Sequence, residues 1–84
     1  MEIDQYSCYK AKVNYHRTDD LKEGSPLNGE EIIVQAVWKA DKGEKFDGQW
    51  IFMPSVHSFW LPACDLIILD EVDPKIYYAR GGKI

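Results

Sequence analysis

The chain has 84 residues, 14 of them acidic and 10 basic, and 45% of its residues are hydrophobic. This length suits one domain, and the composition is that of a folded protein with a small core rather than a disordered chain. The net charge of −4, without lysines clustered beside aromatic residues, argues against nucleic-acid binding. The sequence has no apolar run long enough to cross a bilayer and no signal peptide, so we expect a cytoplasmic protein that does not contact membranes.

The first predicted strand lies within residues 6–17, where apolar and polar residues alternate. Its apolar face carries four residues: Tyr9, Ala11, Val13 and Tyr15. Such alternation indicates a strand with one buried face. The loop that follows is rich in turn-forming residues and contains Asp19 and Asp20. Near its end, Asn28 and Gly29 predict a tight turn in which the backbone adopts a positive φ.

A second strand is predicted over residues 32–38, which are dense in β-branched side chains. Alternation along this strand places Trp38 on the same face as Val34 and Ala36. We therefore expect Trp38 to be buried. Trp60 also has apolar neighbours in its own predicted strand, and we expect it to be buried as well.

Three shorter strands are predicted at residues 49–53, 59–61 and 66–69. Pro54 and Pro62 end the first two, because proline lacks the amide donor that a strand ladder needs. No segment repeats apolar residues at helical spacing, so we predict no long helix. Residues 76–78 fit either a last strand or a turn that caps the fold.

Five short strands separated by turn signals predict an all-β domain. An open sheet of this size would expose its edges, so the pattern favours closure into a small five-stranded barrel. We assign residues 1–69 to this barrel and residues 70–84 to a C-terminal extension.

The order of these elements resembles that of Src homology 3 domains: strand, long acidic loop, strand, polar loop, strand, short turn, strand, proline turn and short strand. Several short motifs carry the resemblance, which covers about residues 9–69: AKVNY at 11–15 resembles the ALYDY opening, RTDDL at 17–21 the acidic loop, LNGEEIIV at 27–34 the next turn and strand, Trp50 the groove tryptophan, and FWLPACDL at 59–66 the segment G-[YF]-[IV]-P-S-N-Y-V.

The resemblance implies a Src homology 3-like barrel whose groove binds proline-rich peptides between aromatic ridges, with loop acids that pair with a peptide arginine. By position, it assigns the partner-binding residues: Tyr15, Asp19, Asp20, Trp50 and Pro62. The chain departs from the family where Val13 and Asp65 stand at two groove tyrosines. The loss of two ridges weakens the case for ordinary PxxP recognition.

The residues themselves leave two of these assignments open. Trp50 suits either an exposed contact platform or the core, because an amphipathic ring fits both places. Asp19 and Asp20 either attract a basic residue of a partner or serve as turn residues that satisfy nearby backbone donors.

The sequence favours a protein without catalytic activity or cofactor. Cys8, His16, His57 and Cys64 are residue types that bind zinc, but their spacing matches no metal-binding motif. Nucleophilic catalysis would need Cys8 or Cys64 beside a histidine, for example Cys64 with His57, and nothing in the sequence activates the thiol. Whether Cys8 and Cys64 form a disulfide is left open.

We therefore predict a small protein- or peptide-interaction module. Tyr15 and Trp50 would supply flat contact area, Asp19 and Asp20 would orient a basic residue of the partner, and Pro62 would shape the groove floor.

The alternative is a small accessory or inhibitory protein that covers a larger folded enzyme. It would bind that enzyme through a sheet edge or through the apolar hairpin at residues 50–60. The identity of the partner and the oligomeric state are not fixed by the sequence, and self-association is a third alternative.

Overall fold

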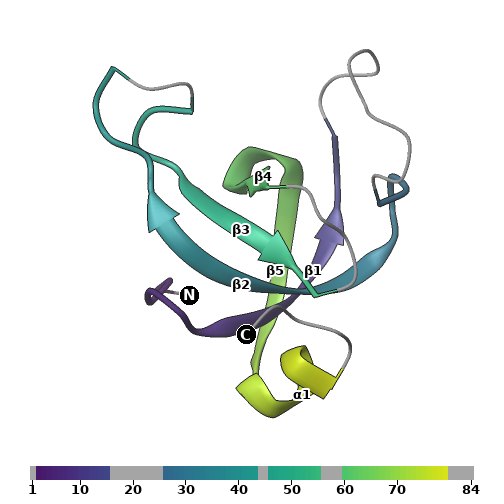
Figure 1. Cartoon of the computed structure of the whole chain (residues 1–84). Helices are drawn as coiled ribbons and strands as arrows, with labels where there is room; N and C mark the ends of the chain where they lie inside the picture. Colours follow the sequence, from purple (N-terminus) through teal and green to yellow (C-terminus); the bar gives the residue numbers. More distant parts are fainter. Residues whose placement is uncertain (1, 16–25, 44–45, 56–59, 80–84) are drawn as a thin grey trace.

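The computed structural model describes residues 2–15, 26–43, 46–55 and 60–79. Its elements in chain order are β1 (Cys8–Val13), β2 (Glu31–Lys39), β3 (Trp50–Pro54), β4 (Leu61–Pro62), the 3₁₀ helix η1 (Ala63–Asp65), β5 (Leu66–Val72) and α1 (Pro74–Ala79). The five strands form one antiparallel sheet in the order β4-β3-β2-β1-β5 (Figure 1). The prediction of a mostly β fold is confirmed.

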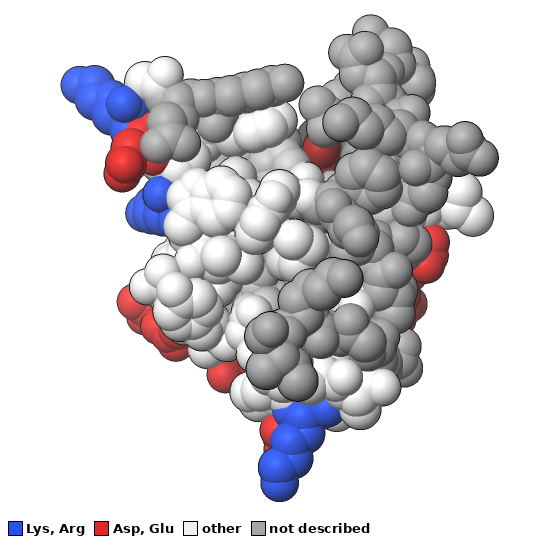
Figure 2. All heavy atoms as spheres, in the orientation of Figure 1, with Lys and Arg blue, Asp and Glu red and all other residues white. Residues whose placement is uncertain are grey.

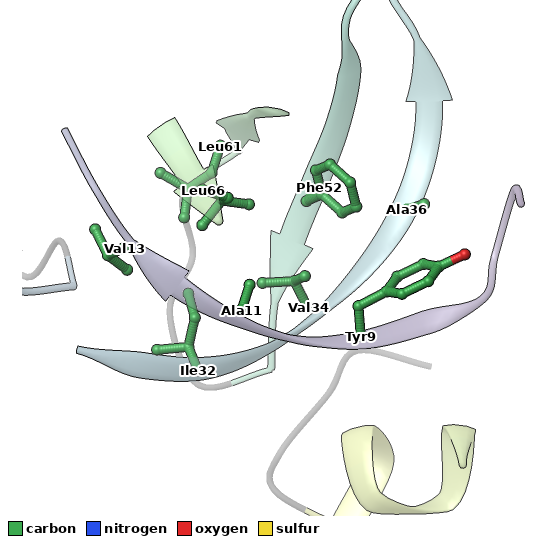
Figure 3. Close-up of a cluster of buried hydrophobic side chains, with 9 residues drawn as sticks. All are labelled: Tyr9, Ala11, Val13, Ile32, Val34, Ala36, Phe52, Leu61 and Leu66. Atoms are coloured by element: carbon green, nitrogen blue, oxygen red, sulfur yellow. The ribbon is translucent and has the colours of Figure 1, made fainter. Parts of the chain in front are cut away.

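The core lies on one face of this curved sheet, where alternate residues of β1 and β2 are buried. Figure 3 shows the main cluster projecting from the same side of the strands: Tyr9, Ala11, Val13, Ile32, Val34, Ala36, Phe52, Leu61 and Leu66. The rings of Tyr9 and Phe52 meet edge to face with their centroids 6.3 Å apart. The buried Tyr9 hydroxyl accepts a hydrogen bond of 2.9 Å from the Asp4 N–H, so its polar atom is satisfied inside the fold.

The opposite face of β1 and β2, here called the outer face, is partly covered by α1. Cys8 and Ile33 alternate with the core residues of these strands and form a second cluster with Tyr77 of the helix. Asp73 begins the helix: its carboxylate accepts a hydrogen bond of 2.9 Å from the Lys75 N–H, and Pro74 occupies the first helical position. Residues 76–78 therefore belong to a helix, and the prediction of a last strand or capping turn there is wrong.

The prediction that Trp38 is buried is also wrong, because β2 contains a bulge. Ala36 lies opposite Phe52, whereas Trp38 lies opposite Ile51, so Val37 is an extra residue in the pairing with β3. A one-residue shift moves the following side chain to the other face of a sheet. Trp38 consequently lies on the outer face and is 36% exposed.

The expected closure into a barrel is not found. Among the strands described, β4 and β5 are the two ends of the sheet and do not pair with each other. Strand β4 has only two residues, and η1 turns the chain between the two end strands. The other end strand, β5, has an irregular register with β1, which shifts opposite Lys10 and Ala11. Further along β5, the Glu71 N–H donates a hydrogen bond of 2.9 Å to the Asp70 carboxylate. Bulges and acidic residues discourage pairing at an open edge without closing it.

Candidate functional site

Three of the predicted site residues, Tyr15, Trp50 and Pro62, lie around η1, which is hydrogen-bonded to both neighbouring parts of the sheet. The Asn14 N–H donates to the Asp65 carbonyl at 2.8 Å. On the other side, the Cys64 N–H donates to the Gln49 side-chain carbonyl at 2.8 Å. In Figure 1, η1 accordingly lies between the end of β1 and the start of β3. These two bonds fix the chain directly before Tyr15 and directly before Trp50 onto consecutive residues of one short turn.

Tyr15 is half-buried and held by the segment around Asn28. Its N–H donates to the Asn28 side-chain oxygen at 3.0 Å, and its hydroxyl donates to the Pro26 carbonyl at 3.0 Å. Gly29 has a φ of 87°, which confirms the predicted turn and brings Asn28 close to the end of β1. The Tyr15 ring thus has a fixed position and packs against the main core cluster.

Trp50 begins β3 opposite Lys39 and is half-buried against the same core cluster as Tyr15. The sequence left open whether Trp50 is a core residue or an exposed contact platform. The structure places it between these two, because Trp50 packs against the core and remains partly accessible to solvent. Pro62 is buried in β4, opposite Ile51, and stands in extended conformation immediately before η1. It supports the turn from within the fold.

The two positions at which the chain departs from Src homology 3 domains are both interior. Val13 is part of the core, and Asp65 is only 3% exposed. Neither residue therefore forms a ridge on this surface. The exposed residue of the turn is Cys64, whose sulfur lies 3.8 Å from a carboxylate oxygen of Asp65. Partial burial, and secondarily the Asp65 charge, raises the pKa of the Cys64 thiol, which makes the reactive thiolate scarcer at neutral pH.

The acidic part of the predicted site, Asp19 and Asp20, lies outside the described residues, as do His16 and His57. Cys8 and Cys64 are both free thiols. Among the described residues, no group of three or more potential metal ligands comes together. No helix in the described parts of the chain is long and apolar enough to span a membrane.

A second aromatic surface was missed by the reasoning from sequence. The rings of Trp38 and Trp60 lie with their centroids 4.8 Å apart. Trp60 is 49% exposed, so the prediction that it is buried is wrong, as it is for Trp38. Ile51 lies opposite Trp38 in the sheet and is nevertheless only 5% exposed on this outer face. Because directly opposite residues share a face, Ile51 lies between Trp38 of β2 and Pro62 of β4 on this face. No glycine or proline marks the bulge that places Trp38 there, so no local signal in the sequence indicated the pair.

In Figure 2 the described residues near the centre of the visible face are mostly uncharged, and the visible lysine side chains lie at its margin. Such a distribution suits contacts in which apolar and aromatic groups supply most of the binding area.

No protein-family model, no curated protein and no solved structure matches this chain.

Proposed function

We propose that the chain is a non-catalytic interaction module that binds an extended peptide segment of a partner protein across η1, between Tyr15 and Trp50. The observation that carries this proposal is the pair of hydrogen bonds that joins Asn14 and Gln49 to η1. They hold two half-buried aromatic rings near one turn, and rigid aromatic rings provide contact area at a low cost in conformational entropy.

The proposal includes a Src homology 3-like arrangement, in the form of an open sheet rather than a closed barrel. Two features support it. The strands follow one another in the order that the resemblance implies, and the proline turn between β4 and β5 takes the form of Pro62 followed by η1. The residues that the resemblance places in a groove, Tyr15 and Trp50, are both next to this turn.

The burial of Val13 and Asp65 limits the kind of peptide that would bind. With two aromatic residues in place of a longer row of ridges, the surface suits a short segment rather than a repeated proline-rich helix. Asp19 and Asp20 would favour a basic residue in that segment, mainly by steering the encounter and fixing the direction of the bound peptide.

The test begins with selection of binding peptides from a random displayed library, with the full chain as bait. A selected peptide is then titrated calorimetrically against the wild type and two matched variants, Trp50→Ala and Trp60→Ala. We expect Trp50→Ala to weaken binding about tenfold or more, since a central aromatic contact contributes at least that much. Trp60 and η1 lie on opposite sides of β4 along the chain, because Trp60 precedes this strand and η1 follows it. We therefore expect Trp60→Ala to bind like the wild type.

Equal binding by the wild type and Trp50→Ala would overturn the proposal, provided that circular dichroism shows Trp50→Ala to be folded. The pair Asp19→Asn and Asp20→Asn tests the acidic contribution separately. This double variant should slow association and reduce the salt dependence of binding while changing the dissociation rate little.

The alternative function, an accessory protein that covers a larger folded partner, is favoured by a different observation. The Trp38–Trp60 pair is exposed on the outer face, away from the core side of the sheet. A partner bound there would be lost with Trp60→Ala and retained with Trp50→Ala, and no short linear peptide would replace it. The same two variants therefore separate the two functions.

A further inference from the structure

Helix α1 packs on the second cluster of buried residues through a single side chain, Tyr77. It has six residues, and Tyr77 is the one buried residue among them. The side chains beside it are open to solvent, with Ile76 42% exposed and Tyr78 39% exposed. A helix this short does not persist without tertiary contacts, because too few hydrogen bonds offset the cost of nucleation. Its position therefore depends on how firmly Tyr77 is held.

Beneath the helix lies an apolar strip of the outer face. Cys8 is fully buried, Ile33 nearly so, and Val72 packs against them together with Tyr77. Register places this strip and the Trp38–Trp60 pair on the same face of the sheet: Ile33 alternates with Gln35, Gln35 lies opposite Met53, and Met53 alternates with Ile51 beneath Trp38. Among the residues that the structure describes, α1 covers one end of this face through Tyr77.

Among the described residues, the other links between α1 and the sheet are a weak hydrogen bond and the short connection at the start of the helix. The Gln35 side-chain amide donates to the Tyr78 hydroxyl at 3.3 Å, an exposed bond whose loss water can compensate. At the other end, Asp73 alone separates β5 from the helix and caps its first turn. Rotation at this single residue can carry α1 away from the outer face without breaking any pair of the β1–β5 ladder.

We propose that α1 is a latch: it opens and closes on the sheet through Tyr77, independently of global unfolding, and in its closed state it occupies the apolar strip formed by Cys8, Ile33 and Val72. Opening exposes this strip next to the Trp38–Trp60 pair and enlarges the apolar area on the outer face. The latch is independent of the peptide surface around η1, which lies between the other ends of β1 and β3.

Cys8 provides a direct probe of this opening, because its thiol is buried when α1 is closed. In a Cys64→Ala variant Cys8 is the only thiol, and its reaction with an aromatic disulfide reagent releases a coloured thiolate that reports each opening. The reaction is followed at increasing urea concentrations and compared with the global unfolding equilibrium measured by circular dichroism on the same variant. Local openings in proteins have lower free energies than global unfolding and expose little surface.

We expect the rate in the absence of urea to exceed by about tenfold or more the rate that global unfolding permits, and to change little at low urea. A rate that follows global unfolding down to zero urea overturns the proposal. In this comparison Tyr77 is unchanged, so the result does not depend on whether a Tyr77 variant folds.

A pair of neighbouring substitutions tests the anchor. In the Cys64→Ala background, Tyr77→Ala should accelerate the reaction of Cys8 about tenfold or more, because 1.4 kcal/mol of lost docking energy already gives that factor. Ile76→Ala, which truncates an exposed residue of the same helix, should stay within about twofold of the parent. Equal acceleration by both substitutions would show that helix stability, and not the Tyr77 anchor, controls access, and would contradict the latch.

Discussion

The indole rings of Trp38 and Trp60 contact each other, with their centroids 4.8 Å apart and their planes inclined by 65°. They come from β2 and from the residue before β4, so neither is a neighbour of the other along the chain. One extra residue in β2 turns Trp38 outward, to the face that it shares with Ile51, and this position allows its contact with Trp60. A backbone irregularity thus creates the most exposed aromatic pair among the described residues.

The first prediction concerns the coupling between these two rings. In a double-mutant cycle of Trp38→Ala and Trp60→Ala, we expect an interaction energy of about 0.5–1.5 kcal/mol, as is typical of edge-to-face aromatic pairs. Urea unfolding of the wild type, both single variants and the double variant measures it. Each single variant should remain folded, since both rings are partly exposed. Strict additivity of the two substitutions would mean that the rings do not stabilise each other.

The second prediction compares two adjacent residues of β3 that face opposite ways. Phe52→Ala should lower the free energy of unfolding by about 3–5 kcal/mol, because Phe52 is fully buried and contacts Tyr9. Met53→Ala, on the half-buried outer face, serves as the control and should cost clearly less. The measurement is urea unfolding, or expression as folded protein if Phe52→Ala exceeds the stability of this small domain. Similar losses at both positions would contradict the assignment of the core face.

The third prediction concerns the hydroxyl of Tyr15. Tyr15→Phe removes the hydrogen bond to the Pro26 carbonyl and keeps the ring, so we expect a loss of about 0.5–1.5 kcal/mol in unfolding free energy. Tyr6→Phe is the matched control. Tyr6 is 60% exposed, so the loss of its hydroxyl should change the free energy of unfolding little. If the proposed peptide binds through the Tyr15 ring, its affinity should be nearly the same for Tyr15→Phe. A large loss of affinity would instead assign a binding role to the hydroxyl.

The fourth prediction is a pH dependence that arises from Tyr77. Burial, and secondarily the neighbouring Cys8 and Tyr78, raises the pKa of Tyr77 to about 12 from the ordinary value of 10.0. The folded state therefore holds this proton more tightly than the unfolded state does. The resulting stabilisation is complete below pH 10 and is lost as the pH rises from about 10 to about 12.

Ultraviolet absorbance of tyrosinate, recorded against pH for the wild type and Tyr77→Phe, measures this titration. The difference between the two curves should have its midpoint near 12 wherever circular dichroism shows that the fold is retained. A midpoint near the ordinary value in the folded protein would mean that the ring is hydrated and α1 is not closed over it. The stability of Tyr77→Phe should also decline less steeply above pH 10 than that of the wild type, because this variant lacks the ionising hydroxyl.

Much of the sheet could be predicted from local patterns, because those patterns act over a few residues. Alternation identified the buried face of β1 through Tyr9, Ala11 and Val13, and the β-branched run identified β2. Gly29 adopts the positive φ that the Asn–Gly pair implies, and β4 ends at Pro62 as expected. Each of these features depends on backbone preferences or on one side chain at a time.

The candidate site divides in the same way. Sequence reasoning named Tyr15, Trp50 and Pro62, and the structure adds the bonds from Asn14 and to Gln49 that join their surroundings at η1. The role of Asp19 and Asp20 stays a prediction. The helix at residues 74–79 was not expected, although Asp73 followed by proline is a known signal for a helix start. With one buried residue, the helix has no apolar repeat that could reveal it.

Local sequence therefore determined where the strands and turns lie, and tertiary structure decided which way their side chains face and how the sheet ends. The bulge at Val37 moved Trp38 from the expected core to the outer face and made its contact with Trp60. The sheet stayed open between β4 and β5. Both outcomes depend on register between strands that are distant in the chain, and register is set by the sum of many packing contacts that no short segment contains.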